Sequence, residues 1–430
     1  MYLTGWTVAL AALGAVPAAL SQSRGVAFAW MLGVALLALL DAWLAPRTAT
    51  VGVRREAPTS VRLTEPTSTR LVAGHVGGRR RVRGVLRDAW QPSAGAARTR
   101  HRFDLGPGEA ATFATAMRPT RRGDRHAGPV TVRTAGPLRL AGRQRSVEVP
   151  ARLRVLPEFA SRKHLPSRLK RLREIDGSTA VRLKGAGSEF DSMREYVIGD
   201  DVRAIDWRST ARRGEVLVRT FRPERDRRVL IAIDCARQSA ARVGDAPRLD
   251  ASIEAALLLA ALASRAGDRV QATAFDRSER ARAAATGEQI MPLLAEALAT
   301  VEPSLLEPDW PALLRLAQSR VSQRALVVLL TTVDTSATDS GLLEAVAALQ
   351  RHHQVLVASV EDPEVAEMAA GRDDAAAAYA AGAAARALLE REAVAAQLRR
   401  LGAEVVLAAP DSLAPDVTDR YLALKAAGRL

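Results

Sequence analysis

Residues 185–234 read GAGSEFDSMREYVIGDDVRAIDWRSTARRGEVLVRTFRPERDRRVLIAID. Acidic and basic side chains are closely interleaved through most of this stretch, with aromatic residues spaced among them. The stretch then runs into residues 229–234, an apolar run that is typical of a strand buried on both faces. We therefore expect a charged, irregular segment that leads directly into the first strand of a buried parallel sheet.

The charged part of this stretch has the composition of a braced loop. Gly199, Asp200 and Asp201 form a turn signal, and interleaved carboxylates and guanidiniums can form paired hydrogen bonds that lock a loop. A catalytic nucleophile needs an adjacent base, and this stretch contains no histidine and no such pair. Structural bracing or recognition is therefore favoured. A hydrolytic or phosphoryl-handling site built from the aspartates, Asp206 and Arg212 remains the alternative.

A pattern of glycine, charged and aromatic residues runs through the same stretch. Its members are Gly187, Glu189, Phe190, Arg194, Glu195, Tyr196, Gly199, Asp200, Asp201, Arg203, Asp206, Trp207 and Arg212. In this order and spacing they resemble the signature of the domain of unknown function 58 family. The resemblance implies a membrane-anchored protein with a cytoplasmic von Willebrand factor A-like domain, similar in context to partners of MoxR-type AAA+ ATPases. We interpret these residues as a structural or recognition signature and predict no catalytic residue.

From residue 229 onward, apolar strand patterns alternate with helical patterns. Strands are expected at 229–234, 270–275, 325–331, 355–360 and 405–408, and helices at 249–266, 289–301, 310–321, 341–350, 373–401 and 413–427. Such alternation predicts an α/β fold with a doubly wound parallel sheet. The resemblance implies that this sheet is of the von Willebrand factor A type.

Ligands of such sheets bind at the carboxyl ends of the strands. The first strand ends in Asp234, and the family resemblance places a magnesium motif, Asp-x-Ser-x-Ser, at this point. Here Ala236 and Gln238 replace both hydroxyl residues, and either Asp334 or Thr332 occupies the place of a further aspartate. We therefore predict a degenerate site and no cofactor, with Mg²⁺ at Asp234 and Asp334 as the alternative.

The first 46 residues contain two long apolar runs. Residues 2–20 carry no charge, and residues 25–44 carry only Asp41, so each run can cross a bilayer. The turn between them carries Arg24 alone, whereas Arg47, Arg54 and Arg55 follow the second run. The length and composition of the two runs predict a two-helix transmembrane hairpin in the cytoplasmic (inner) membrane, and the charge asymmetry places the rest of the chain in the cytoplasm.

The remaining parts differ in composition. We expect a β-sandwich-like domain over 47–150, a basic linker over 151–184, the signature segment over 185–228 and the α/β domain over 229–430. The net charge of +15 is concentrated towards the N-terminus: residues 51–150 hold 20 arginines and 7 acids. A basic helix within the linker would present either a membrane-facing or a solvated cationic face. The single cysteine, Cys235, fits a reducing compartment.

These features predict a bacterial, membrane-anchored, non-enzymatic adaptor that binds proteins. The expected partners are a MoxR-like AAA+ ATPase or its client protein, together with membrane lipids at the two spans and the basic flank. Aromatic residues make up only 4% of the chain, and no run interleaves stacking rings with basic residues, so no nucleic-acid partner is expected. Nucleic-acid binding by the basic region is kept as an alternative.

Overall fold

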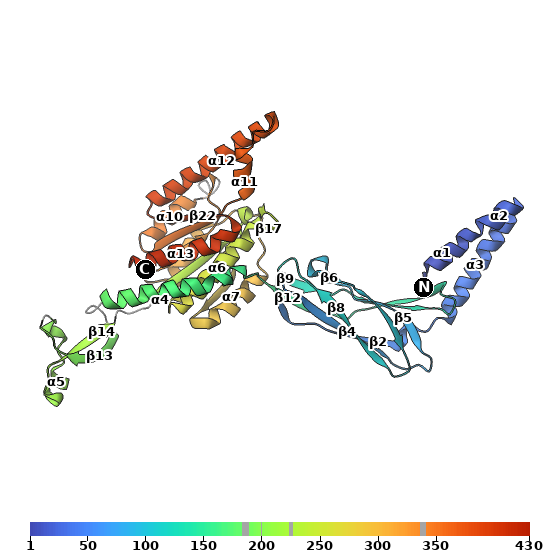
Figure 1. Ribbon diagram of the computed structural model, residues 1–430, viewed down its shortest axis with the longest axis horizontal. Coiled ribbons are helices and arrows are strands. Elements are labelled where there is room, and N and C mark those ends of the chain that lie inside the picture. The colour runs from blue at the N-terminus through green and yellow to red at the C-terminus, as the bar shows by residue number, and fades with distance from the viewer. Residues whose placement is uncertain (183–188, 199, 223–226, 336–340) are drawn as a thin grey trace. The chain divides into compact units, whose positions relative to one another are not determined.

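The computed structural model describes residues 1–182, 189–198, 200–222, 227–335 and 341–430 (Figure 1). The chain divides into two compact units, Met1–Leu156 and Pro157–Leu430. The fold is mixed α/β with several separate sheets. The expectations at Gly187 and Gly199 lie outside the described residues.

The first unit begins with apolar helices. They are α1 (Gly5–Leu13), α2 (Ala15–Ser21) and α3 (Arg24–Leu44). By length and composition α3 can cross a membrane, whereas Gly5–Ser21 is a shorter apolar run. The indole N–H of Trp30 donates to the carbonyl of Leu10 at 2.9 Å, and a side chain at Gly14 would overlap the Trp30 ring. The two runs therefore lie against each other, with glycine at the closest approach.

The rest of the first unit is β-rich. Its elements are β1 (Tyr2–Leu3), η1 (Thr48–Thr50), β2 (Val51–Glu56), β3 (Ser60–Arg62), β4 (Thr67–His75), β5 (Val82–Arg87), η2 (Pro92–Ala94), β6 (Ala96–Ala97), β7 (Arg100–Leu105), β8 (Ala110–Met117), β9 (Gly123–His126), β10 (Val130–Ala135), β11 (Ala141–Val147) and β12 (Arg152–Leu156). The two larger sheets have the orders β1-β11-β10-β5-β7 and β2-β4-β8-β6, and a smaller sheet has the order β3-β12-β9. Alternate side chains of the two larger sheets form one apolar core that includes Leu71, Leu86 and Val132.

The boundary of the β-rich unit lies beyond the expected residue 150. Residues 152–156, expected in the linker, form β12, which pairs with β3 and β9. The helix that follows, α4 (Leu165–Arg182), is also packed: Leu165 and Leu172 lie in the core of the second unit, and Arg168 pairs with Asp419 at 2.6 Å. Over residues 165–175, α4 carries basic residues on one side and apolar residues on the other, and Leu165 and Leu172 on the apolar side are buried.

The second unit is built on a six-stranded sheet. Its strands are β15 (Arg228–Asp234), β18 (Arg269–Phe275), β19 (Glu279–Ala285), β20 (Leu326–Leu330), β21 (Gln354–Val360) and β22 (Glu404–Ala408), in the order β19-β18-β15-β20-β21-β22. All neighbours are parallel except β19, which runs antiparallel to β18 at one edge. The strand patterning did not predict β19, because its sequence, ERARAAA, lacks β-branched and aromatic residues.

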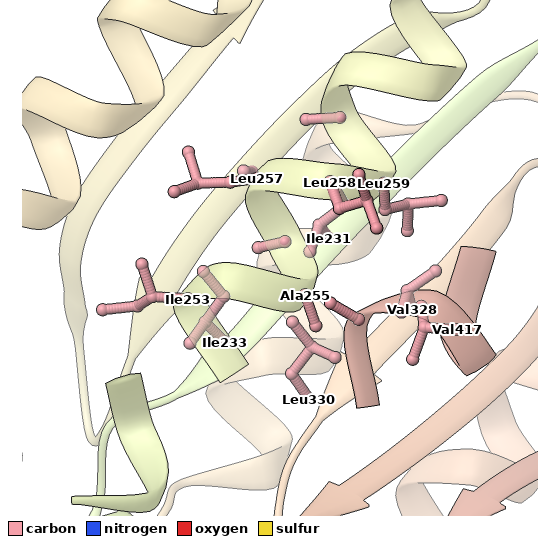
Figure 2. Close-up of a cluster of buried hydrophobic side chains, with 14 of the residues drawn as sticks. Ile231, Ile233, Ile253, Ala255, Leu257, Leu258, Leu259, Val328, Leu330 and Val417 are labelled. Atoms are coloured by element: carbon pink, nitrogen blue, oxygen red, sulfur yellow. The ribbon is translucent and has the colours of Figure 1, made fainter. Parts of the chain in front are cut away.

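Helices cover both faces of this sheet. They are α6 (Arg248–Arg265), α7 (Ile290–Ala299), α8 (Trp310–Arg320), α10 (Leu342–Gln350), α12 (Ala375–Arg400) and α13 (Pro410–Ala426). A further helix, α11 (Pro363–Ala370), has no buried residue and packs against α12. Alternate side chains of β15 point to opposite faces, so that Ile231 and Ile233 join one core with α6, α7 and α13, and Leu230 joins another with α8, α10 and α12. Of the 18 residues of α6, 13 are buried, so this helix is central to its layer (Figure 2).

Short elements complete the second unit. They are η3 (Ala160–His164), η5 (Arg237–Ala240), β16 (Arg242–Val243), β17 (Ala246–Pro247) and η6 (Gly287–Gln289). The signature segment forms its own small substructure from β13 (Glu189–Glu195), η4 (Val202–Ala204), α5 (Trp207–Arg213) and β14 (Leu217–Arg222). We call residues 189–198 and 200–222 the arm.

Candidate functional site

The frame of the arm is the antiparallel pair of β13 and β14, with an irregular register between Phe190 and Ser192. Four signature residues, Glu189, Phe190, Arg194 and Glu195, lie on β13. Tyr196 continues this ladder, since its N–H donates to the carbonyl of Val216 at 2.8 Å. The ladder therefore fixes where the charged loop begins and ends.

A turn follows β13, and Asp200 holds it closed. Its Oδ1 accepts a hydrogen bond from Arg194 Nη2 at 2.5 Å, and its Oδ2 accepts one from the N–H of Val197 at 3.0 Å. The N–H of Asp200 donates back to the carbonyl of Val197. The bond from Arg194, reinforced by the bond from Val197, lowers the pKa of the Asp200 carboxyl. The turn is thus closed by a carboxylate that stays ionised at neutral pH.

Asp201 and Asp206 each cap a helical turn. Asp201 accepts from the N–H of Arg203 at 2.9 Å at the start of η4, and Asp206 accepts from the N–H of Ser209 at 2.9 Å at the start of α5. The second oxygen of Asp206 accepts from Arg219 Nε at 2.6 Å. The bond from Ser209, followed by the bond from Arg219, lowers the pKa of Asp206. These carboxylates are therefore engaged in shaping the loop.

Apolar side chains of the arm are directed into solvent. Ile198 is 96% exposed and Trp207 is 68% exposed, and Val197 and Val202 are also exposed. We call these four residues the apolar set. Arg212, in the last turn of α5, is exposed as well. The signature pattern identified Trp207. Ile198 and Val202 were missed, although both are aliphatic residues within an otherwise charged, non-periodic loop, and that is the signal that could have identified them.

The second predicted site lies at the end of β15. Asp234 is only 2% exposed; its Oδ1 accepts from the N–H of Ala236 at 2.8 Å and its Oδ2 accepts from the Thr331 hydroxyl at 2.7 Å. Burial raises the pKa of Asp234 to about 6, and the nearby charges of Glu307 and Asp276 act in the same direction. Asp234 thus ties the end of β15 to the segment that follows β20.

This donor set does not fit a magnesium ion. Both oxygens of Asp234 are already engaged by protein donors, and Ala236 and Gln238 supply no hydroxyl. Asp334 acts electrostatically on Arg248, whose pKa is lowered by burial and then by Arg391. Within the described residues, no three Asp, Glu, His or Cys side chains are grouped closely enough to hold a metal.

Cys235, next to Asp234, is a buried thiol. Its Sγ donates to the carbonyl of Phe275 at 3.0 Å. Burial, followed by the charges of Asp276 and Asp234, raises the pKa of this thiol to about 12. Because the thiolate is the reactive form, the side chain is unreactive at neutral pH.

Comparison with known proteins finds relatives that are described as uncharacterized. The uncharacterized protein Rv1480 of Mycobacterium tuberculosis is 26% identical over 197 residues, which cover 45% of this chain and 61% of that protein. The uncharacterized protein YeaD of Bacillus subtilis is 28% identical over 113 residues, covering 26% of this chain and 28% of YeaD. The chain therefore spans less than two thirds of the length of each of these relatives.

Among solved structures, the CARDB domain of a Pyrococcus furiosus protein aligns with 27% of this chain and 91% of that domain, at 12% identity and a TM-score of 0.19, a likeness too slight to support a conclusion. The family described as "Protein of unknown function DUF58" matches residues 192–419, which take in most of the arm and most of the six-stranded sheet with its helices. The chain belongs to the DUF58 family.

Proposed function

We propose that this chain is a membrane-anchored adaptor that binds proteins in the cytoplasm and performs no bond chemistry itself. Its partner in this proposal is a MoxR-type AAA+ ATPase or a client of one, as the family resemblance implies. The single observation that carries the proposal is the arm, where ionised carboxylates brace a loop that exposes the apolar set. Exposed apolar residues on a braced loop are typical of a protein-binding surface.

The strand order of the second unit supports a von Willebrand factor A-like, doubly wound fold. In chain order its strands lie 3-2-1-4-5-6 across the sheet, with the third strand, β19, antiparallel at the edge. Helices cover both faces. In this proposal the sheet is the protein-binding scaffold, and the Asp234 site has been converted from ligand binding to a structural contact with Thr331.

The apolar N-terminal helices support a membrane anchor. The helix α3 has the length and composition of a membrane span, and Gly5–Ser21 would complete a hairpin with it. Arg47, Arg54 and Arg55 follow α3, whereas only Arg24 lies between the two apolar runs. Positive charge favours the cytoplasmic side, so we place both compact units in the cytoplasm.

The proposal is tested by capture from a detergent extract. The tagged full chain should enrich an AAA+ ATPase, and the variants Ile198→Ser and Trp207→Ala should reduce that enrichment at least about tenfold, as expected for hot-spot residues. Leu389→Ser is the matched control, because Leu389 is 73% exposed on α12, outside the arm.

Two results would contradict the proposal. One is capture in which no ATPase is enriched by the wild-type chain. The other is turnover of a phosphate ester or peptide substrate by the purified chain alone, with loss of turnover in Asp201→Ala while folding is retained. The second result would favour the enzymatic alternative, in which the carboxylates of the arm act on a substrate.

A further inference from the structure

The end of α3 is joined to β11 by an arginine. Arg143 Nε donates to the carbonyl of Ala42 at 3.1 Å, and its Nη2 donates to the carbonyl of Trp43 at 3.0 Å. These are carbonyls of the last helical turn, which has no internal partners for them. The two bonds use two of the five N–H donors of the guanidinium and hold its charge beside the last turn of the apolar helix.

A hollow of about 750 Å³ lies at this junction. The side of the hollow formed by α3 is apolar and includes Leu39, Leu40 and Trp43, each exposed to solvent. The side formed by β11 is polar and includes Arg143 and Gln144. The hollow therefore has an apolar wall that continues along the helix and a cationic rim at the end of the helix.

The charge around this rim is positive. Arg47 adjoins Thr48, which also lines the hollow, and Arg145 follows Gln144 along β11. The nearest acid in sequence, Asp41, is buried, and its oxygens accept three hydrogen bonds from the N–H groups of residues 138, 140 and 141. The lining residues that the structure places here include a cation and no acid.

We infer that this hollow binds one anionic glycerophospholipid of the cytoplasmic leaflet, with its phosphate at Arg143 and the upper part of an acyl chain along Leu39, Leu40 and Trp43. The inference rests on the membrane anchor of the proposed function. A span that ends at Leu44 places these residues at headgroup depth, where tryptophan is favoured and anionic lipid is concentrated. Arginine pairs with phosphate oxygens through charge-assisted hydrogen bonds.

The test titrates the detergent-purified full chain with phosphatidylglycerol or phosphatidylcholine and follows its melting temperature and the lipid retained in native mass spectrometry. Phosphatidylglycerol should bind and stabilise the wild type. Arg143→Gln should weaken this binding about fivefold or more, since one arginine near an anionic headgroup is lost. Gln144→Glu should weaken this binding comparably, because it adds a negative charge to the lining of the hollow. The bonds of Arg143 to the end of α3 are kept in this variant, and glutamate can still accept the bond that Arg133 donates at 2.7 Å.

Arg102→Gln is the matched control, since this exposed arginine lies on β7 at the other edge of the same sheet. Equal binding of phosphatidylcholine, unchanged binding in both rim variants, or equal stabilisation by water-soluble glycerol 3-phosphate would overturn the inference. Carbonate extraction of membranes distinguishes failure of the membrane anchor from failure of the lipid site. A chain released by carbonate contradicts the anchor itself, whereas a retained chain without lipid preference contradicts only this site.

Discussion

Asp234 is a buried carboxyl whose ionisation opposes folding. Its pKa is about 6 in the folded chain, against 3.8 for an unperturbed aspartate. The folded state therefore holds the proton more tightly than the unfolded state does, and the free energy of unfolding falls as pH rises from about 4 to about 6. Above that range the loss is complete and amounts to at most about 3 kcal/mol.

Asp234→Asn should remove this pH dependence. Its amide can accept from the N–H of Ala236 and donate to the Thr331 hydroxyl, so both contacts can be kept without a buried charge. We expect the variant to be more stable than the wild type at pH 8 by about 1–3 kcal/mol and equal to it near pH 4. Urea unfolding followed by tryptophan fluorescence, to which buried Trp310 contributes, measures the difference. A rise in wild-type stability with added Mg²⁺, absent in the variant, would contradict the structural role of Asp234.

A second buried charge is paired. Asp268 accepts from the Tyr421 hydroxyl at 2.6 Å and lies 3.4 Å from Lys425 Nζ, and all three side chains are almost fully buried. Lys425→Met should lower the free energy of unfolding by about 3–5 kcal/mol, because it leaves the Asp268 carboxyl without its counter-charge. The double variant with Asp268→Asn should recover much of this loss in the same unfolding assay. A double variant as unstable as the single one would show that the packing of Lys425, and not its charge, stabilises the fold.

The position of a site residue could be predicted where the local sequence pattern alone determines it. Asp234 could be placed at the end of an apolar strand from the sequence, whereas the degenerate metal motif stays a prediction that the family resemblance implies. The segment that follows β20 was expected beside Asp234, through Thr332 or Asp334, but the contact itself is made by Thr331, which only the register of β15 with β20 determines. The contact of Lys425 with Asp268 was not predictable, because 157 residues separate the two.

Among the elements, α3 is held to the β-rich part of its unit by Asp41 as well as by the bonds of Arg143. Asp41 Oδ1 accepts from the N–H of Leu138 at 2.8 Å, and its Oδ2 accepts from the N–H groups of Leu140 at 2.7 Å and Ala141 at 2.9 Å. A side chain at Gly136 would overlap this carboxylate. The sequence alone presents Asp41 only as an interruption of an apolar run, whereas the fold uses it to hold a loop against the helix.

Asp41→Ala should loosen this loop. Three N–H groups would lose their acceptor, and each unsatisfied buried group costs about 1–3 kcal/mol. We expect hydrogen exchange at the amides of 138, 140 and 141 to become at least about tenfold faster, with little change in the strands of the second unit. Gly136→Ala should produce the same local effect by displacing the carboxylate. Unchanged exchange in both variants would show that the loop is held by other contacts.

Elements with a strong periodic pattern were predictable within a few residues. The strands β15, β20 and β21 are continuous apolar runs, and α6 carries an apolar surface broad enough to be recognised without its neighbours. The strand β19 was missed because the hairpin with β18 and the cover of α7, rather than its own residues, make it a strand. The strand β4, TSTRLVAGH, has a weak strand pattern, because small and polar residues interrupt its alternation.

At the scale of the whole molecule, the proposal separates anchoring from binding. Basic residues dominate 51–150, with 20 arginines against 7 acids, whereas residues 231–430 hold 20 basic and 27 acidic groups. If both units lie in the cytoplasm, this distribution of charge suits the basic unit to contact with the anionic membrane surface. It suits the acidic unit to the binding of proteins. The order of these parts is readable from composition, because a bilayer span, a β-rich region and an α/β region differ in residue usage over long windows.

The proposed membrane orientation can be measured by labelling introduced cysteines, because the natural thiol should not react with the reagent. Cys235 is the only cysteine, it is buried, and its pKa is about 12, so a membrane-impermeant maleimide should leave the wild-type chain unlabelled. Ser23→Cys, between α2 and α3, should be labelled in cells whose inner membrane is intact, because in the proposed orientation the turn between the two helices faces outward. Leu389→Cys, exposed on α12, should be labelled only after the inner membrane is opened. Labelling of Leu389→Cys in intact cells would contradict the cytoplasmic placement of the second unit, and failure to label Ser23→Cys would show that α1 and α2 do not span the bilayer.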